Sequence, residues 1–370
     1  MILLNDFKRQ WADTRREVLS ALTSVGESGW YVLGGEVQQF EEALAELWGV
    51  RHCVGVASGL DAIEIALRAA GCQAGDRVLT TPVSAFATTL AILKLGAIPV
   101  FADVDDAGQI DLGACEALLA ARPEIRFLVP VHLYGQPLDP AALATLRDRR
   151  GARIVEDCAQ SILARRGGQP TGAVGIAAAT SFYPTKNLGA LGDGGAILTN
   201  DPALAEAFRQ LRDYGQAAKY EHERIGYNSR LDEMHAAVLR RAALPRLADW
   251  TARRRDIAAR YRREIRHTDV RIPAVADGAE PCWHLFPVLV PAGKRAAFES
   301  WLKERGIATG RHYPTAIPDQ PAMRTAAFEA PLGIERARAF CGSEVSLPIH
   351  PYLLDDEVGG VVEAVNTWKG

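Results

Sequence analysis

The sequence predicts an α/β protein whose mostly parallel sheet is covered by helices on both faces. From residue 35 onward, short apolar runs bounded by turn residues alternate with segments of helical periodicity. The runs are apolar at consecutive positions, which is typical of parallel strands that are buried on both faces. Strands that alternate with helices in this way build a sheet with helices on either side.

The individual elements follow from spacing. The first predicted helix covers residues 35–49, where apolar residues recur at steps of three and four and therefore share one face. These residues are Val37, Phe40, Leu44 and Leu47. Two further helical stretches cover residues 85–96 and 140–151. The predicted strands are the apolar runs at residues 77–82, 98–104, 126–135, 153–159, 177–184 and 195–200.

The chain changes character near residue 230, where a long, charge-rich helical segment begins that extends to residue 265. Pro245 lies inside this segment and is expected to kink or divide the helix. The elements expected after it are a strand, a helix, a second strand and a final helix, with the first strand and both helices at residues 283–291, 294–306 and 355–368. We therefore expect a large domain over residues 1–245 and a small α+β domain over residues 246–370.

The composition limits the classes of partner. The chain has 42 Lys+Arg against 45 Asp+Glu, and its formal charge of −3 lacks the basic excess that binding to nucleic-acid phosphates needs. The sequence does not open on a basic segment followed by an apolar one, and the most apolar stretch, residues 86–104, is interrupted by Lys94 and Pro99. We expect a cytoplasmic protein that binds neither nucleic acid nor membranes.

The cysteines lie far apart and form no Cys-x-x-Cys pair. This spacing favours neither a zinc site nor a disulfide framework, so we expect reduced, mostly buried thiols and no bound metal. The six residues are Cys53, Cys72, Cys115, Cys158, Cys282 and Cys341.

The glycine-rich stretch at residues 189–195 leaves one alternative open. Such a stretch can form a dinucleotide-binding loop, but here it precedes a strand instead of opening a helix, and it lies in the middle of the chain. A nicotinamide-dependent oxidoreductase therefore stays an alternative hypothesis for this chain.

Three local patterns point to chemistry. Ser58, followed three residues later by Asp61, is typical of a helix cap, and a Ser-Gly turn that enters a helix also offers backbone N–H groups to a phosphate. Asp157 ends an apolar strand, at the edge where open α/β sheets bind their ligands. Lys186 lies in a glycine-rich loop between two predicted strands, where the backbone can approach a ligand closely. Taken singly, these residues also fit a plain cap, a salt-bridge partner and a solvated lysine.

Together and in this order, the three patterns are the parts that pyridoxal phosphate requires. Its aldehyde needs a lysine for a Schiff base, its pyridinium nitrogen needs an acid, and its phosphate needs hydrogen-bond donors. The chain resembles the sugar aminotransferases of the DegT/DnrJ/StrS type, fold-type I enzymes that use this cofactor, over nearly its whole length. The blocks that carry the resemblance are LNDFKRQ, SGWYVLGGEVQQFE, SGLDAIEIALRA, EDCAQS, SFYPTKNLGALGDGGA, GYNSRLDEMHAAVL and RHYP.

The resemblance implies a seven-stranded, mostly parallel sheet in the large domain, and it assigns roles residue by residue. Lys186 is the implied Schiff-base lysine, and Asp157 is the implied partner of the pyridinium nitrogen. The other implied cofactor contacts are Ser58, Gly59 and Ser181 at the phosphate, Phe86 on the ring, Gln160 at the ring hydroxyl, and Asn228. The implied substrate contacts are Tyr183, Lys219, His312 and Tyr313. Asn228 matches a residue that acts across subunits, so a homodimer with shared active sites is expected.

The reaction implied by the resemblance transfers an amino group from glutamate to a keto-sugar carried on a nucleotide diphosphate. Relatives with histidine in place of the Schiff-base lysine are dehydratases, so Lys186 favours transamination. The sequence around Tyr183 and Asn228 is similar to members that act on 3-keto sugars, which favours a dTDP-3-keto-6-deoxyhexose and a 3-amino product. Amination at C4, an aminocyclitol (inosose) substrate, and a regulatory protein that binds the cofactor without turnover stay as alternatives. Because no arginine stands out for a donor carboxylate, glutamate rests on the resemblance alone.

Overall fold

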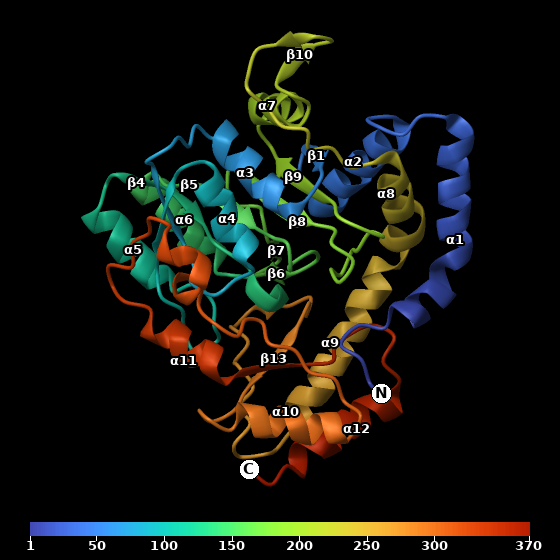
Figure 1. The fold of residues 1–370 in the computed structure, drawn as a ribbon, viewed down its shortest axis with the longest axis vertical. Helices are drawn as coiled ribbons and strands as arrows, with labels where there is room; N and C mark the ends of the chain where they lie inside the picture. The colour runs from blue at the N-terminus through green and yellow to red at the C-terminus, as the bar shows by residue number, and fades with distance from the viewer.

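A seven-stranded sheet forms the centre of the fold, as the resemblance implies. The computed structural model describes residues 1–370, and Figure 1 shows the sheet enclosed by helices. The strand order is β1-β9-β8-β5-β4-β2-β3, in which neighbours are parallel except that β9 is antiparallel to both β1 and β8. The strands are β1 (His52–Val56), β2 (Arg77–Thr80), β3 (Ile98–Phe101), β4 (Ile125–Val129), β5 (Arg153–Asp157), β8 (Ala177–Ser181) and β9 (Gly195–Thr199).

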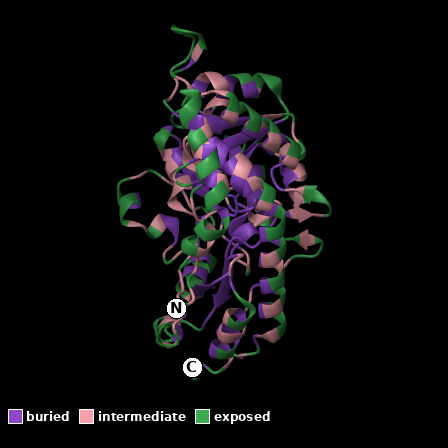
Figure 2. Cartoon of the chain, turned by 90° about the vertical axis from the view of Figure 1, so that its right-hand side faces the viewer, coloured by how far each residue is buried: buried purple, intermediate pink, exposed green.

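Helices cover both faces of this sheet. They are α2 (Gly35–Trp48), α3 (Gly59–Ala69), α4 (Phe86–Lys94), α5 (Leu112–Ala121), α6 (Pro140–Arg150) and α7 (Pro202–Arg212). Consecutive strand residues enter different clusters: in β2, Val78 packs with α3 and α4, whereas Leu79 packs with α5 and α6. Figure 2 shows the buried residues concentrated in this middle layer. The two-sided burial explains why the strand sequences are apolar at successive positions, and the predicted α/β class is confirmed.

The long helical segment near residue 230 is divided at Pro245, as predicted. It begins with α8 (Glu233–Val238) and passes through a π-helical turn at residues 239–243 and a 3₁₀ turn at residues 244–246. The helix α9 (Leu247–Glu264) then leads away from the large sheet (Figure 1). Its first turns pack in the cluster that contains α2, and its later turns pack in the C-terminal core.

The C-terminal part is a smaller α+β unit built on a two-stranded antiparallel sheet. Strand β13 (Phe286–Leu289) pairs with β14 (Glu344–Leu347), and α9 and α12 contribute to the same core. The helices of this part are α10 (Arg295–Glu304), α11 (Glu335–Ser343) and α12 (Asp355–Asn366). The start of the chain also belongs here, because Ile2 pairs with residues 306 and 308 through its backbone N–H and C=O. The division into domains at residue 245 stays a prediction, since α9 and the N-terminal residues connect the two parts.

Several elements are not among those predicted from the sequence. The N-terminal helix α1 (Phe7–Ser28) begins at the cap Asp6 and packs against α8 and the turn that follows it. The hairpin of β10 (Gln216–Ala218) and β11 (Glu221–His222) projects from the body at the top of Figure 1. A small three-stranded sheet consists of β6 (Arg165–Arg166), β7 (Gln169–Pro170) and β12 (Ala279–Glu280).

All six thiols are free and buried, as expected from their spacing. None of the helices combines the length and the apolar composition that crossing a membrane would require.

Candidate active site

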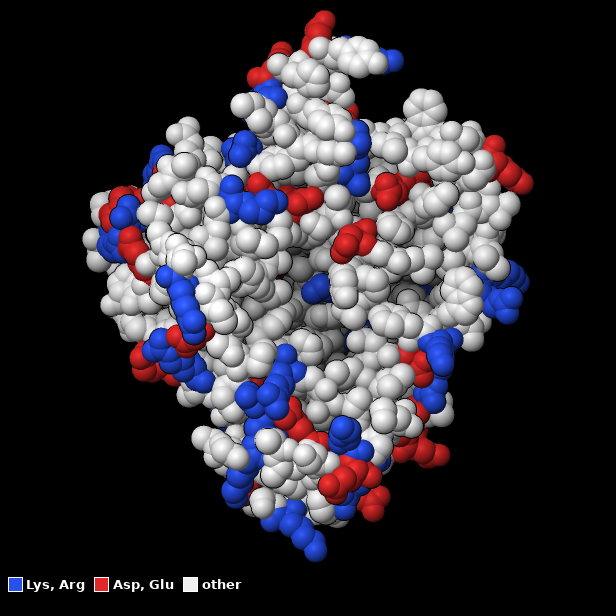
Figure 3. Space-filling view, viewed as in Figure 1, with Lys and Arg blue, Asp and Glu red and all other residues white.

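A cavity of about 530 Å³ lies at the carboxyl ends of the strands, where parallel sheets bind their ligands. The residues after β1, β2, β4, β5 and β8 line one side of it, and segments around residues 284 and 312 of the C-terminal part line the other. Figure 3 shows a hollow near the middle of the face seen in Figure 1, bordered mainly by uncharged atoms. The predicted site residues inside the cavity are Ser58, Gly59, Asp157, Gln160, Ser181, Tyr183, Lys186, His312 and Tyr313.

Asp157 is the last residue of β5 and is held by two donors. Its Oδ2 accepts a hydrogen bond of 2.8 Å from the hydroxyl of Thr88, and its Oδ1 accepts one of 3.0 Å from the N–H of Ala159. Burial raises the pKa of Asp157, while the two donors and the nearby Lys186 counteract part of that rise. The result is a buried acid that is fixed in orientation at the floor of the cavity.

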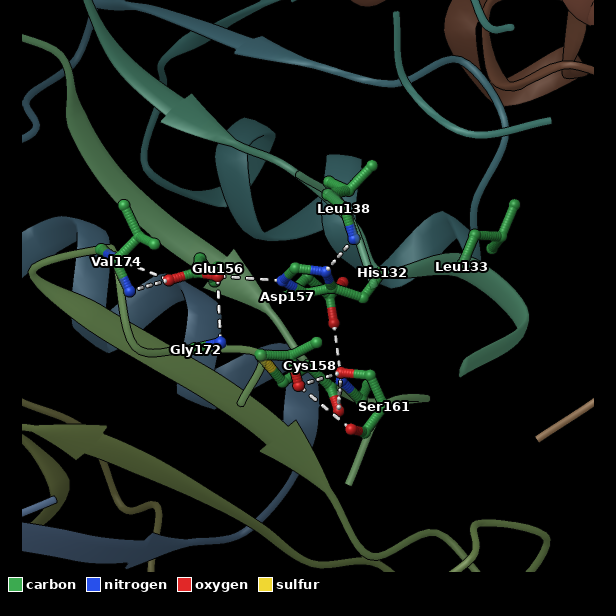
Figure 4. Close-up of polar contacts among 12 residues, drawn as sticks. His132, Leu133, Leu138, Glu156, Asp157, Cys158, Ser161, Gly172 and Val174 are labelled. Atoms are coloured by element: carbon green, nitrogen blue, oxygen red, sulfur yellow. Dashed lines mark hydrogen bonds and ion pairs between the residues drawn. The ribbon is translucent and has the colours of Figure 1, made fainter. Parts of the chain in front are cut away.

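The strand that carries Asp157 is anchored by a buried cluster around Glu156 and His132 (Figure 4). The Nδ1 atom of His132 accepts a hydrogen bond from the N–H of Leu138, so its ring proton lies on Nε2 and is donated to Glu156 at 2.9 Å. Burial raises the pKa of Glu156, but His132 and a set of backbone donors outweigh burial and lower it overall. These donors are the N–H groups of Gly172, Val174 and Gly175.

Lys186 enters the cavity from a tight loop between β8 and β9. Its backbone N–H bonds to the carbonyl of Tyr183 at 2.8 Å, and a Cβ at Gly189 would lie 2.5 Å from the carbonyl oxygen of Pro184. The loop can therefore close this tightly only with glycine at 189. Burial lowers the pKa of Lys186 to about 8, against the opposing effect of Asp157. A lysine with this pKa supplies a substantial fraction of neutral amine near neutral pH, which is the nucleophilic form.

The start of α3 forms a close-packed cradle. The Ser58 hydroxyl accepts the N–H of Asp61 at 3.1 Å and caps the helix, as the spacing predicts. Gly59 lies so close to Ser181 that a Cβ would be 2.6 Å from the Cβ of that serine. Backbone N–H groups at the positive end of the helix and two hydroxyl groups thus converge on one corner of the cavity, a donor set that suits a phosphate.

The C-terminal part closes the opposite side of the cavity. Gln160 bonds to it directly, because its Nε2 donates to the Tyr313 hydroxyl at 3.2 Å, while its Oε1 accepts the N–H of Tyr134 at 2.7 Å. Burial lowers the pKa of His312 to about 4, and the positive charge of Lys186 acts in the same direction. His312 is therefore a neutral imidazole at physiological pH.

Three predicted residues lie outside this cavity. Phe86 begins α4 and packs in an apolar cluster, although its neighbours Ala85 and Ala87 line the cavity. Asn228 is exposed and is bridged to Asp213, and Lys219 lies on the projecting hairpin over the ring of Tyr220. Within one chain the structure does not bring Asn228 and Lys219 to the other site residues.

Other residues that line the cavity are not among the predicted site residues. Thr88 and His284 lie inside a helix and next to a strand, and their sequence neighbours are those of an ordinary core. Leu4 and Asn5 reach the cavity from the N-terminus, and Thr185 and Asp193 reach it from the loop of Lys186. These four residues lie in the blocks LNDFKRQ and SFYPTKNLGALGDGGA that carry the resemblance, so the sequence does contain a signal for them.

The sequence profile of one family matches nearly the whole chain. This is the DegT/DnrJ/EryC1/StrS aminotransferase family, and the match covers residues 12–366. The chain belongs to this family. The prediction of an aminotransferase is thereby confirmed.

Relatives in the DegT/DnrJ/EryC1/StrS family cover the chain almost end to end. A dTDP-3-amino-3,4,6-trideoxy-α-D-glucose transaminase of Streptomyces venezuelae is 43% identical, over 98% of this chain and 95% of its own length. A protein of Saccharopolyspora erythraea named erythromycin biosynthesis sensory transduction protein EryC1 is 40% identical, over 96% of both chains.

Solved structures of similar proteins share the fold. DesV of S. venezuelae, crystallised in complex with a ketimine intermediate, has a TM-score of 0.94 at 42% identity and covers 99% of this chain and 98% of its own. NtdA of Bacillus subtilis, solved with bound cofactor PMP, has a TM-score of 0.86 at 28% identity and covers 95% of this chain and 81% of its own. The likeness confirms the predicted fold, and pyridoxal phosphate is confirmed as the cofactor at the level of this family.

Proposed function

We propose that the chain is a pyridoxal-phosphate-dependent aminotransferase that moves an amino group from glutamate to C3 of a nucleotide-linked keto-sugar. One observation carries this proposal. A single cavity at the carboxyl ends of the strands contains a phosphate cradle, a buried acid and a lysine of lowered pKa. The family of the chain and the name of the S. venezuelae relative, a transaminase of a 3-amino sugar, support the sugar and the carbon position.

The residues present fit the cofactor. Ser58, Gly59 and Ser181 would hold the phosphate, since their donors converge and the corner is too tight for a side chain at residue 59. Asp157 would face the pyridinium nitrogen, and Gln160 would face the ring hydroxyl. Bound pyridoxal phosphate supplies an aldehyde for covalent capture of amines and an electron sink for the electrons released at the substrate carbon.

Lys186 does most of the chemistry assigned to this chain. Its Nζ would hold the cofactor covalently, and as a free amine it would act first as the base that takes a proton from the substrate carbon and then as the acid that gives the proton back. The lowered pKa of about 8 suits both directions of proton transfer, because a general base works best near the operating pH. Asp157 would accept a hydrogen bond from the protonated ring nitrogen, and the C-terminal part would shield the amine of Lys186 from bulk water.

A homodimer with shared active sites forms part of the proposal. Asn228 and Lys219 lie outside the cavity of their own chain, on and beside a hairpin that projects from the body (Figure 1). Large apolar side chains are exposed in the same region, including Tyr220 at 80% and Ile225 at 86%. In a dimer the second copy would cover the exposed apolar side chains, and Asn228 and Lys219 would reach the cavity of that second copy. The cytoplasmic location expected from the sequence stays a prediction.

Replacement of Lys186 tests the proposal directly. Lys186→Ala should abolish amino transfer from glutamate and should remove the visible absorbance of covalently held cofactor, because no other lysine lines the cavity. Lys303→Ala, which removes an exposed lysine of α10, is the matched control and should leave both unchanged. Substantial turnover by Lys186→Ala would overturn the assignment.

The identity of the sugar is tested by offering different keto-sugars to the protein in its aminated cofactor form. The protein is first converted to its aminated cofactor form with glutamate, and nucleotide-linked 3-keto and 4-keto sugars and an inosose are then offered separately. The substrate that restores the original absorbance identifies the acceptor, and we expect a 3-keto-6-deoxyhexose on dTDP. A protein that binds the cofactor but is not converted by glutamate would be the regulatory alternative, and one without cofactor absorbance would reopen the nicotinamide alternative.

A further inference from the structure

A buried carboxyl group, Glu344, lies behind His312 and has no charged partner. Glu344 is 0% exposed in the middle of the C-terminal part, and its two oxygens accept hydrogen bonds from the backbone N–H of His312 (2.6 Å) and the hydroxyl of Ser346 (2.5 Å). The arginines around it bond elsewhere: Arg311 pairs with Glu299, and Arg295 bonds to the carbonyl of Cys341. A buried carboxyl group without a cation is costly, so its retention calls for a role.

The strand geometry directs this group at the active site. Residues 344 and 346 alternate with Val345 and Leu347, which face the C-terminal core, so the two polar side chains share the opposite face of β14. Backbone hydrogen bonds between Gly310 and Ser346 dock the segment before His312 along this face. The Ser346 hydroxyl thereby lies 2.9 Å from His312 Nδ1.

The three side chains form an unbranched chain of hydrogen bonds. The Ser346 hydroxyl has one proton, and when Glu344 is ionised this proton goes to the carboxylate. The hydroxyl oxygen can then only accept from His312, so the imidazole proton must lie on Nδ1. His312 Nε2 is left without a proton, and it has no hydrogen-bond partner within the protein although the residue lines the cavity.

Protonation of Glu344 reverses every bond of this chain. The carboxylic acid donates to Ser346, Ser346 donates to His312 Nδ1, and the imidazole proton moves to Nε2. We propose that Glu344, acting through Ser346, is a positioning residue that decides whether His312 Nε2 accepts or donates a hydrogen bond in the cavity. The ionised form presents an acceptor, which suits a sugar hydroxyl group beside the reacting carbon; this consequence rests on the proposed function, whereas the coupling of the three side chains does not.

The pKa of Glu344 allows this reversal to occur near neutral pH. Burial raises the pKa of Glu344 to about 7, and Glu299 acts in the same direction, while the two hydrogen bonds and Arg295 act against it. His312 itself stays neutral over this range because burial and Lys186 lower its pKa to about 4. Other titratable groups lie near enough for Glu344 or His312 to shift their pKa values, and these are Tyr134, His284, Arg311, Tyr313 and Cys341.

The state of the imidazole can be read directly. Two-bond ¹H–¹⁵N correlation spectra of the full chain, loaded with cofactor and labelled with ¹⁵N-histidine, distinguish the two neutral tautomers by their nitrogen shifts; His312→Gln identifies the signals. We expect the Nδ1–H form at pH 8.5 and a shift to the Nε2–H form at pH 5.5. Glu344→Gln should hold the Nε2–H form at both pH values. The carboxamide oxygen of Gln accepts from the backbone N–H of His312, so its NH₂ group donates to the Ser346 hydroxyl, and Ser346 then donates to His312 Nδ1.

Two further variants distinguish the hydrogen-bond relay of Glu344, Ser346 and His312 from a merely structural role of Glu344. Ser346→Ala should make the tautomer independent of pH, and it keeps the test decisive if Glu344→Gln does not fold. Glu363→Gln removes an exposed carboxyl group of α12 that has no ion pair and does not act on Glu344, so it should leave the pH response in place. A tautomer in the unmodified protein that does not change with pH, or one that Glu344→Gln does not alter, would overturn the relay.

The kinetic consequence is a rise in KM for the keto-sugar. Glu344→Gln should raise KM by roughly three- to tenfold at pH 8.5, the scale of one lost hydrogen bond, with little change in the half-reaction with glutamate. A normal tautomer response in a protein that transfers no amino group would contradict the proposed function and leave the relay intact. An unchanged KM together with the expected tautomers would remove the acceptor role toward the sugar.

Discussion

Burial moves the pKa values of two titratable side chains at the floor of the cavity, and the shift of Lys186 serves amino transfer because it favours the neutral amine. Burial lowers the pKa of Lys186 and raises that of Asp157, because an apolar surrounding disfavours both charged forms. Each group partly offsets the effect of burial on the other, since their charges have opposite sign. A positively charged ring nitrogen next to Asp157 would favour the ionised carboxylate.

Asp157→Asn tests the acid. An amide cannot hold the proton on a ring nitrogen, so turnover should fall by about 10²-fold or more, the scale found when one electrostatic contact to a developing charge is lost. Steady-state kinetics with glutamate and the active keto-sugar measure this fall. Thr88→Ser, which retains the hydroxyl that orients the carboxylate, should stay close to the unmodified protein. Activity of Asp157→Asn within a few fold of the original would contradict the role.

The lowered pKa of Lys186 predicts the pH dependence of cofactor capture. Only the neutral amine attacks an aldehyde, and its fraction falls about tenfold for each pH unit below the pKa. With a pKa of about 8, the rate at which cofactor-free protein captures pyridoxal phosphate should rise from pH 6 to about pH 8 and then level off. Stopped-flow absorbance measures this rate. A rise that continues to pH 10 would show a lysine of ordinary pKa.

At the scale of elements, the entry to α3 is the most tightly constrained part of the site. Gly59→Ala would place a Cβ 2.6 Å from that of Ser181, so strand and helix must separate. We expect a loss of about 1–3 kcal/mol in the free energy of unfolding and weaker binding of the cofactor. Gly342→Ala in α11 is the control, because its Cβ would meet nothing within 4 Å and a helical alanine should be neutral or stabilising. Urea unfolding and cofactor titration compare the two, and equal stability would contradict the close packing.

Elements with a strong local pattern could be predicted from the sequence, and those defined by contacts could not. The apolar periodicity of residues 35–49 predicted a helix, and Pro245 predicted an interruption of the later helical segment; the structure confirms both. The first helix, α1, buries Thr14, Val18, Ala21 and Val25 at steps of three and four, so its periodicity is present in the sequence although the helix is not among the predicted elements. In the site, Asp157 ends a recognisable strand and Lys186 lies in a glycine-rich loop between two others, whereas Thr88 and His284 reach the cavity only through the packing of their elements.

At the scale of the whole molecule, the position of Asn228 predicts active sites shared between two chains. Lys186→Ala and Asn228→Ala should each lose most activity when purified alone. If Asn228 acts in the neighbouring site, each mixed dimer contains one intact site out of two. In an equal mixture about half of the dimers are mixed, so about one quarter of full activity should be recovered. Refolding or co-expression of the two variants, with the dimer measured by light scattering, makes the test. No recovery in a demonstrated mixed dimer would place Asn228 in its own chain's site or in none.

The pairing of Ile2 with residues 306 and 308 has a consequence for the order of folding. Residues 4 and 5, which follow Ile2, line the cavity, so one wall of the site depends on a contact between segments far apart in the sequence. Contacts of such high sequence separation form late, because the loop between them must close first. During synthesis residue 2 emerges long before residues 306–308 exist. The nascent chain therefore cannot complete its cavity until the residues up to Tyr313, about half of the C-terminal part, have left the ribosome.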